Sequence, residues 1–242
     1  MASREVIVLV GGTSSLAKAL VDRYLAKKNI ARIIITARSK EKFDSLYSSY
    51  SSEDIEFYEL DVLNLIDIEK LVSSVKKYER KVVFHYLAAV KHIGSRDVEN
   101  LFKVNFLSSV YFYDILLKTM DSFDFILIGS QGDIHGSYNT SSYNASKAAI
   151  SNYFEPIALR NQGNQKVCII KPWLFQSKMI KSSRLINAMT CSPEYIAKVA
   201  INKIQRGKSL IYIPAFTYKL IELLSFINKK LLYAILFKFL KQ

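Results

Sequence analysis

The sequence predicts an α/β fold: a doubly wound parallel sheet of about seven strands with helices on both faces. Short apolar runs typical of buried parallel strands recur along the chain, and helical segments separate them. The chain has 242 residues, half of them hydrophobic, which is compatible with one domain around a large core. We expect strands at 5–10, 32–36, 55–60, 82–87, 124–129, 167–171 and 209–213, and helices at 15–28, 40–50, 64–78, 97–118, 142–161 and 193–206.

A glycine turn follows the first expected strand. The apolar run Glu5–Val10 leads into the segment Gly11–Ser15, and a helix begins near Leu16. Strand, glycine turn and helix in this order form a phosphate-binding crossover, because backbone N–H groups at the helix N-terminus face the pyrophosphate. The candidate contacts are Gly11, Thr13, Ser14, Ser15 and Leu16.

The end of the second expected strand indicates which dinucleotide binds. In NAD-binding proteins an acidic residue near this position holds the ribose 2′-hydroxyl. The segment Thr36–Lys40 contains no acid, and Arg38 can pair with a 2′-phosphate. This favours NADP(H) over NAD(H), although Arg38 could also be an ordinary surface arginine.

Tyr143 and Lys147 form the candidate catalytic pair, with Ser130 upstream after the fifth expected strand. Side chains at i and i+4 of a helix lie on one face. An ammonium held beside a phenol favours the phenolate, so we expect the pKa of Tyr143 to be lowered toward neutrality. Such a tyrosine can exchange a proton with an alcohol or carbonyl oxygen, and Ser130 can hold the same oxygen. This layout predicts carbonyl/alcohol redox chemistry.

The last expected helix has clear boundaries. Ser192 and Pro193 suit the N-cap and first helical position, and Gly207 suits the residue after the helix.

Taken together, these motifs resemble the classical single-domain type of the short-chain dehydrogenase/reductase family, over residues 4–215. The segment Gly11–Ala17 is similar to the family's Thr-Gly-x-x-x-Gly-x-Gly turn, and Asp61-Val62 is similar to its adenine-contacting Asp-Val. Ala88-Ala89 lies where the family has Ala-Gly of Asn-Ala-Gly. The resemblance implies a Rossmann fold and a homo-oligomer.

The resemblance also implies a catalytic tetrad of Asn105, Ser130, Tyr143 and Lys147. Tyr143 would donate the proton, Lys147 would lower its pKa and bind the nicotinamide ribose, Ser130 would orient the carbonyl, and Asn105 would hold a water in a proton relay. The segment beginning at Lys171 is similar to the one that contacts the nicotinamide. The implied cofactor contacts, beyond the glycine turn, are Arg38, Asp61, Val62, Ala88, Ala89, Tyr143, Lys147, Pro172, Leu174 and Ser177.

Four positions depart from the family pattern. Ser15 and Ala17 replace glycines, and both are small enough to permit close approach of a pyrophosphate. Leu87 removes a polar side chain that normally braces the central strands. Trp173 puts a large ring beside the expected nicotinamide site.

Composition narrows the functional classes. The net charge is +13, but Lys and Arg are spread along the chain without a nucleic-acid motif, so we expect no nucleic-acid partner. Cys168 and Cys191 form no disulfide framework and look like buried reduced thiols. No secretory signal is visible, and we expect a cytoplasmic protein. The histidines are scattered, so no metal site is expected; His135 could face the substrate or be a plain loop residue. They are His85, His92 and His135.

Two further segments bear on the substrate and on partners. Residues 173–191 form an apolar and basic expected loop, which suits a substrate with a lipid or anionic part but also fits ordinary packing. Residues 216–242 form a basic amphipathic tail after a domain at 1–215. The tail is too short in apolar residues to span a bilayer, so it would lie at the inner membrane surface, pack on its own domain or pair with another subunit.

The sequence thus predicts an NADP(H)-dependent oxidoreductase that interconverts a ketone and a secondary alcohol. The glycine turn, the Ser192-Pro193-Glu194 opening and the tail are similar to those of bacterial reductases of surface-polysaccharide and cell-wall sugar synthesis. They suggest a phosphorylated or polyprenyl-linked sugar as substrate. The alternatives are a lipid-like ketone, a 3-oxoacyl substrate, or a catalytically silent cofactor-binding scaffold.

Overall fold

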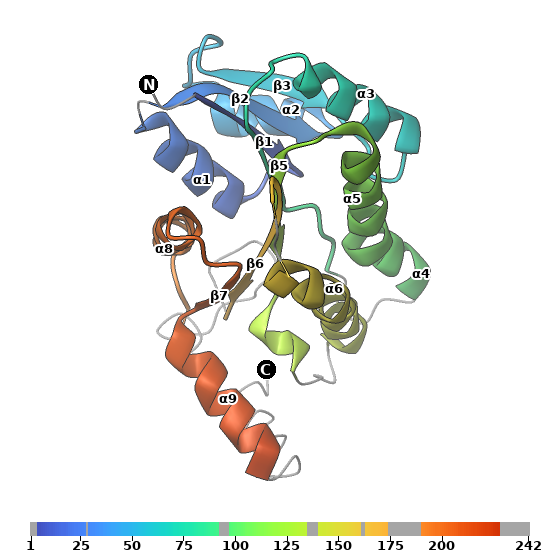
Figure 1. Ribbon diagram of the computed structural model, residues 1–242, viewed down its shortest axis with the longest axis vertical. Helices are drawn as coiled ribbons and strands as arrows, with labels where there is room; N and C mark the ends of the chain where they lie inside the picture. The colour runs from blue at the N-terminus through green and yellow to red at the C-terminus, as the bar shows by residue number, and fades with distance from the viewer. Residues whose placement is uncertain are drawn as a thin grey trace.

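The computed structural model describes residues 4–27, 29–91, 97–134, 140–160, 163–173 and 190–227. Within them, one parallel sheet has the strand order β3-β2-β1-β4-β5-β6-β7 (Figure 1). The strands are β1 (Glu5–Val10), β2 (Ile30–Ala37), β3 (Ile55–Glu59), β4 (Val82–Tyr86), β5 (Phe123–Ile128), β6 (Gln165–Pro172) and β7 (Leu210–Ile213). The predicted doubly wound fold is confirmed.

Helices alternate with these strands. They are α1 (Ser15–Leu25), α2 (Lys40–Tyr47), α3 (Leu65–Lys76), α4 (Val98–Phe102), the π-helical turn η1 (Lys103–Leu107), α5 (Ser108–Thr119), the 3₁₀ turn η2 (Gln131–Asp133), α6 (Ser141–Arg160), α8 (Pro193–Gln205) and α9 (Ala215–Ile227). Ser192 caps α8 by accepting the Tyr195 N–H at 3.1 Å, and Gly207 follows that helix at φ +72°. Both predicted helix boundaries are therefore confirmed.

The chain reverses its winding direction at the centre of the sheet. β1 pairs with β2 on one side and with β4 on the other, so Val10 lies beside both Thr36 and Tyr86. In such sheets, ligands bind outside the carboxyl ends of the strands at this switch point. The fold alone thus places a binding crevice beside the glycine turn that follows β1.

Both faces of the sheet are covered, which explains why the strands are apolar throughout. Helices α1, α2 and α8 lie over one face, and α3, α5 and α6 over the other (Figure 1). Side chains of β1 alternate between the two faces. Val8 packs under α3, α5 and α6, whereas Ile7 and Leu9 pack under α1, α2 and α8.

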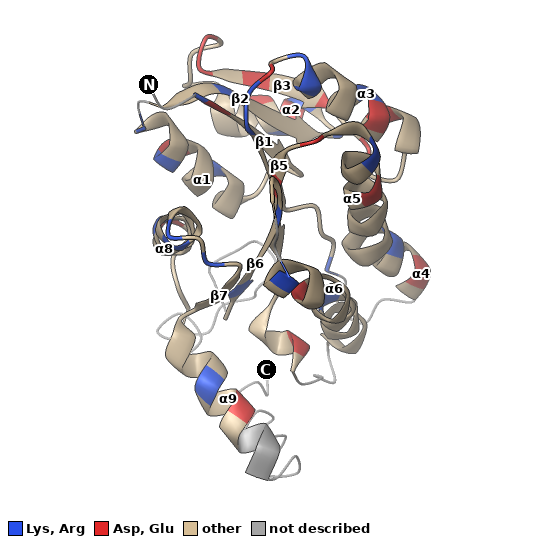
Figure 2. Ribbon diagram, in the orientation of Figure 1, with Lys and Arg blue, Asp and Glu red and all other residues tan. Residues whose placement is uncertain are grey.

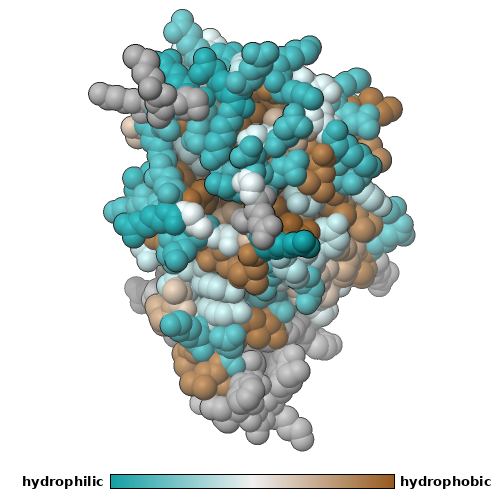
Figure 3. All heavy atoms as spheres, in the orientation of Figure 1, coloured by the Kyte–Doolittle hydropathy of each residue, from teal (hydrophilic) through white to brown (hydrophobic). Residues whose placement is uncertain are grey.

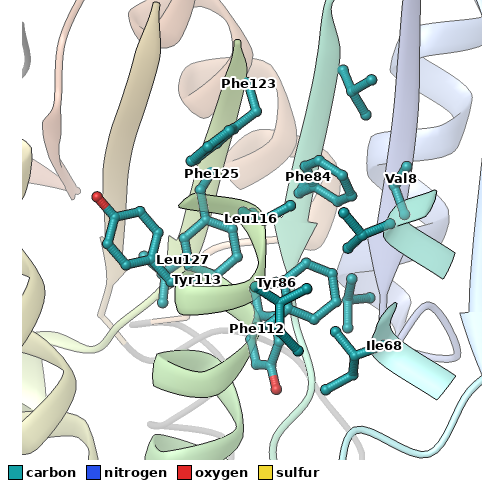
Figure 4. Close-up of a cluster of buried hydrophobic side chains, with 14 of the residues drawn as sticks. Val8, Ile68, Phe84, Tyr86, Phe112, Tyr113, Leu116, Phe123, Phe125 and Leu127 are labelled. Carbon is teal, nitrogen blue, oxygen red and sulfur yellow. The ribbon is translucent and has the colours of Figure 1, made fainter. Parts of the chain in front are cut away.

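Aromatic packing holds α5 against the sheet. Phe112 of α5 lies edge-on to Phe84 and Tyr86 of β4, with ring centroids 5.6 Å apart in each pair, and stacks on Phe125 of β5 at 5.9 Å (Figure 4). The Tyr86 hydroxyl also lies 2.6 Å from the Ser108 Oγ. Such aromatic pairs add specific geometry to the burial of large side chains.

The structure divides the helix expected at 97–118 into α4, η1 and α5. A π-helical turn contains an extra residue, and such turns are frequent at functional sites. Here the turn contains Asn105, which is fully buried. Sequence periodicity could not locate it, because the contacts of Asn105 are with residues outside its own helix.

The first turns of α9 pack on the domain. Thr217 donates a hydrogen bond to the Gln131 Oε1 at 2.6 Å, Ile221 is buried, and the rings of Tyr218 and Tyr212 lie 3.7 Å apart between centroids. Of the tail expected at 216–242, residues 228–242 lie outside the described residues. No helix in the described part of the chain is long and apolar enough to cross a membrane.

The structure describes both cysteines and one of the three histidines. Cys168 is buried as expected, but Cys191 is only half-buried; both are free thiols. His85 is buried with its Nε2 2.7 Å from the Tyr24 hydroxyl, and burial lowers its pKa to about 3. His92 and His135 lie outside the described residues. Among those described, no group of His, Cys, Asp and Glu side chains could hold a metal ion.

Positive charge is spread over most elements of the sheet and helices (Figure 2). Lys171 of β6 differs from the exposed lysines because its side chain is buried. Its Nζ lies 2.6 Å from the Asp133 Oδ2 and also bonds to Glu155 of α6, while Ser151 donates to Asp133. This ion cluster ties β6, η2 and α6 together.

Replacing Lys171 with Met should lower the free energy of unfolding by about 3 kcal/mol, because it leaves the Asp133 carboxylate buried without its cation. Urea unfolding followed by circular dichroism would measure the change. Lys118→Met is the matched control, since Lys118 pairs with Asp114 on an exposed helix face and should change stability by less than about 0.5 kcal/mol. Equal losses in the two variants would contradict the prediction.

Candidate active site

The glycine turn is built for close backbone approach. Gly11 has φ +80°, and a Cβ at this position would lie 2.7 Å from the Ala88 Cα. Its N–H donates to the Thr36 Oγ1 at 3.3 Å, and the Gly12 N–H donates to the Thr36 carbonyl at 2.8 Å. Glycine is therefore required at position 11 by both conformation and space. The turn lies directly against the segment that follows β4.

The turn leads into the N-terminus of α1. Ser14 is the N-cap, and its Oγ accepts the Ala17 N–H at 3.1 Å. Ala17 is fully buried in the core beneath the helix, so the departure from glycine at this position is accommodated by packing. The Ser14 hydroxyl is engaged by its own helix, which leaves first-turn backbone N–H groups as the elements suited to a phosphate.

A hollow of about 450 Å³ lies beyond the turn, lined by Arg38, Glu59, Asp61 and Asp67. Asp61 accepts the Leu63 N–H at 3.0 Å, and Val62 beside it is buried. The sequence shows no acid at the end of β2, but the structure supplies one from the neighbouring strand. Parallel pairing of Ala37 with Glu59 carries that carboxylate to the Arg38 side of the hollow.

Lys147 and Tyr143 lie together on α6, as predicted, but the predicted tyrosine pKa is wrong. The Lys147 Nζ donates to the Ile128 carbonyl at 2.8 Å and lies 5.8 Å from the centroid of the Tyr143 ring. Burial raises the pKa of Tyr143 to about 12 and lowers the pKa of Lys147 to about 8. The cost of burying a charge outweighs their mutual attraction here. Tyr143 is a neutral phenol at pH 7.

Ser130 lies where predicted, at the carboxyl end of β5. Its Oγ accepts the Gly132 N–H at 3.0 Å. A side chain at Gly132 would come within 3.4 Å of the Asn144 Oδ1, so the Ser130 turn packs against the first turns of α6. A serine hydroxyl that accepts one hydrogen bond can still donate its own hydrogen. Ser130 therefore remains able to donate a hydrogen bond beside the Tyr143 helix.

Asn105 is fully buried at this site, and its side chain bonds to protein groups; its role in holding a water stays a prediction. Its Oδ1 accepts the Val90 N–H at 2.7 Å, and its Nδ2 donates to the Val90 carbonyl at 2.9 Å and to the Ser146 Oγ at 3.0 Å. Ser146 in turn donates to the Tyr143 carbonyl at 2.7 Å. Both ends of the amide are engaged by protein groups, so the side chain acts as a clamp between η1, α6 and the segment after β4.

Two predicted cofactor contacts, Ala88 and Ala89, lie in the segment that follows β4, and both are half-buried. Leu87 packs against the apolar core, and its N–H donates to the Val10 carbonyl at 2.8 Å. Leu87 lacks the polar side chain that would brace these strands, as expected. A backbone hydrogen bond nevertheless joins the ends of β1 and β4.

Lys91 lies beside Tyr143, a contact that the sequence did not reveal. Its Nζ lies 5.5 Å from the centroid of the Tyr143 ring. No motif marks this lysine, because its neighbour Tyr143 is distant in the chain. The signal that could have found it is its place just beyond the carboxyl end of β4, where ligands of this fold bind.

The nicotinamide segment is described only in part. Pro172 is buried at the end of β6, and the Trp173 N–H donates to the Ile213 carbonyl at 2.8 Å. The half-buried Trp173 therefore continues the pairing of β6 with β7. Leu174 and Ser177, two predicted cofactor contacts, lie outside the described residues, as does most of the loop expected at 173–191.

Comparisons with known proteins agree with this architecture. A family model described as short chain dehydrogenase matches residues 5–186, more than half of the chain. A short chain dehydrogenase from Burkholderia cenocepacia in complex with NADP has a TM-score of 0.79 at 15% identity, covering 97% of this chain and 98% of that chain.

Two further solved structures show the same fold with different nucleotides. A variant of the actinorhodin polyketide ketoreductase with NADPH has a TM-score of 0.75 at 18% identity, covering 88% of this chain and 97% of that chain. A short chain dehydrogenase/reductase from Burkholderia phymatum in complex with NAD has a TM-score of 0.74 at 14% identity, covering 93% and 95%. These likenesses establish the fold.

Lys147→Met should raise the free energy of unfolding by about 1–3 kcal/mol at pH 7. The folded pKa of about 8 lies below the ordinary 10.5, so folding at lower pH must bury a charged amine. The stabilisation by Met should be largest below pH 8 and shrink as pH rises toward 10.5, where the unfolded lysine also loses its proton. Urea unfolding at several pH values measures it, and a gain that grows with pH would contradict the assignment.

Proposed function

The chain belongs to the short chain dehydrogenase family, and on that premise we propose that it is an NADP(H)-dependent oxidoreductase interconverting a ketone and a secondary alcohol. The proposal is supported by three side chains near the carboxyl edge of the sheet: the neutral Tyr143 phenol, the buried Lys147 and Ser130. The glycine turn after β1 opens onto the same edge.

The residues present fit NADP(H). First-turn N–H groups of α1 suit the pyrophosphate, Asp61 suits the adenine, and Arg38 in the adjoining hollow suits a 2′-phosphate. The structural neighbours include complexes with NADP, NADPH and NAD, so the choice between nucleotides depends on this chain's own residues. Arg38 favours the phosphate, while Glu59 in the same hollow opposes it. When bound, the nicotinamide supplies or accepts the hydride.

The protein supplies the proton and the placement of the substrate oxygen. At pH 7 the Tyr143 phenol holds its proton, so in the reductive direction it can donate that proton to the carbonyl oxygen. The Lys147 ammonium, charged below about pH 8, stabilises the negative charge left on the phenol. Ser130 donates a hydrogen bond to the same substrate oxygen. Asn105 acts through Ser146 by keeping α6 in place.

For the substrate class, we propose a phosphorylated or polyprenyl-linked keto-sugar of bacterial surface-polysaccharide synthesis. The support is the net charge of +13, which favours anionic ligands. A lipid-like ketone or a 3-oxoacyl substrate would use the same Tyr143 chemistry and is the alternative. A scaffold that binds cofactor without turnover is the non-enzymatic reading.

We also propose that α9 contacts a membrane surface, with homo-oligomer packing as the alternative. Phe216, Leu220 and Leu223 recur at helical spacing and are exposed at 70%, 53% and 56%. Figure 3 shows hydrophobic atoms over the described start of α9, and Figure 2 shows that this helix carries both a basic and an acidic residue, Lys219 and Glu222. An apolar helix face beside Lys219 suits the interface of an anionic bilayer.

The cofactor assignment is tested by titrating the purified protein with NADPH and NADH while following nicotinamide fluorescence. Wild type should prefer NADPH. Arg38→Asp should weaken NADPH binding by about 10- to 100-fold, because it removes a charge-assisted pair and adds repulsion, with NADH affected much less. Glu59→Gln should strengthen the preference for NADPH, because it removes a negative charge from the hollow that contains Arg38. Binding of neither nucleotide would contradict the proposed function.

Tyr143→Phe separates the enzyme from the scaffold. The variant should bind NADPH as wild type does but lose ketone reduction by about 100-fold or more, because the proton donor is gone. Ketone-dependent NADPH consumption measures the loss. If the biological effect of the protein survives this substitution, the scaffold reading is favoured.

Replacing Phe216, Leu220 and Leu223 together with Ser should abolish co-sedimentation with anionic phosphatidylserine vesicles, because the apolar contact is removed. The contacts of Thr217 and Ile221 with the domain are kept, so the fold is preserved. Vesicle binding that persists, or a change only in subunit mass by light scattering, would favour subunit packing.

A further inference from the structure

Three lysines lie at or near the carboxyl edge of β4, β5 and β6, and two of them are engaged. Lys171 is held by the carboxylates of Asp133 and Glu155. Lys147 donates to the Ile128 carbonyl. Lys91 forms no ion pair with any carboxylate of the residues that the structure describes, and its Nζ lies against the ring of Tyr143 at 5.5 Å. Among the described residues, its positive charge thus has no carboxylate partner beside the Tyr143 phenol.

The backbone that carries Lys91 is held in place. Val90, the preceding residue, exchanges two hydrogen bonds with the Asn105 amide, at 2.7 and 2.9 Å. The same Asn105 bonds to Ser146 of α6, the helix that carries Tyr143. One buried amide thus bonds both to the residue that precedes Lys91 and to the helix that carries Tyr143. A pre-positioned cation loses little freedom when it binds an anion.

Lys91 is also in surroundings that disfavour its charge. The lysine is half-buried, and desolvation lowers its pKa. Contact with the face of an aromatic ring compensates a cation only in part. A ligand anion at hydrogen-bond distance from the ammonium would compensate it far more, because charge-assisted hydrogen bonds are short and strong.

We propose that Lys91 is a specificity-determining residue that binds an anionic group of the substrate, a phosphate or a carboxylate close to the reacting ketone. The inference rests on the proposed function, since Tyr143 must face the carbonyl oxygen. The Lys91 ammonium lies close to the Tyr143 ring, and the Tyr143 hydroxyl faces the carbonyl oxygen. The anion that Lys91 binds is therefore only a few bonds from the carbonyl. This selects keto acids and short phosphorylated ketones over substrates whose charge is remote from the ketone.

The test uses the full chain saturated with NADPH and two matched pairs of probes. Dihydroxyacetone phosphate is compared with dihydroxyacetone, and 4-oxopentanoate with its methyl ester. Calorimetry measures binding of each probe, and NADPH consumption measures turnover where it occurs. Wild type should prefer the anionic member of at least one pair, which also distinguishes phosphate from carboxylate.

Lys91→Gln should reduce that preference by about 10- to 100-fold, mainly through KM, while Lys91→Arg keeps most of it. The preference is measured as the ratio of kcat/KM for the charged member to that for the neutral member, so that an effect of the substitution on Tyr143, which acts on both members, cancels. Lys118→Gln, the control, removes the same net charge from an exposed pair on α5 and should leave the preference unchanged.

Three outcomes would overturn the inference. The first is that wild type shows no preference for the charged member of either pair, which means that no anion is recognised. The preference could survive Lys91→Gln, which assigns it to other residues. Turnover of charged and neutral probes could fall by the same factor, which means that Lys91 acts on Tyr143 and not on the substrate. Failure of the proposed function is distinguishable, because NADPH itself would then not bind.

Discussion

The site depends most on the hydrogen bonds of one buried amide. Asn105 bonds to both backbone groups of Val90 and to the Ser146 Oγ, and Ser146 bonds to the Tyr143 carbonyl. Three segments that are far apart in the chain are thereby held in one arrangement. Because a buried polar group left unpaired is costly, these partners together stabilise the π-helical turn around Asn105.

The same edge of the sheet carries charges that folding alone would not favour. Lys147 is buried without a carboxylate partner among the described residues, and its pKa falls to about 8 as a result. Lys171, also buried, is instead neutralised by Asp133 and Glu155. Lys171 is thus paired, whereas the burial of Lys147 without a carboxylate partner among the described residues opposes folding, and such perturbed groups are common at functional sites.

Nucleotide preference is a balance between neighbours from different strands. Arg38 follows β2, while Glu59 ends β3 and reaches the same hollow through parallel pairing. A single strand end therefore does not decide the charge that a ribose substituent meets. Solved structures with this fold contain NADP, NADPH or NAD.

The sequence by itself determined the layer architecture, the glycine turn, the Tyr143–Lys147 helix face and the place of Ser130, because each depends on local periodicity or on the order of strand, turn and helix. Tertiary structure alone decided the direction of the Tyr143 pKa, the partners of Asn105, the approach of Glu59 to Arg38 and the position of Lys91. Each of these depends on burial or on contacts between distant segments, and a linear pattern carries no measure of either.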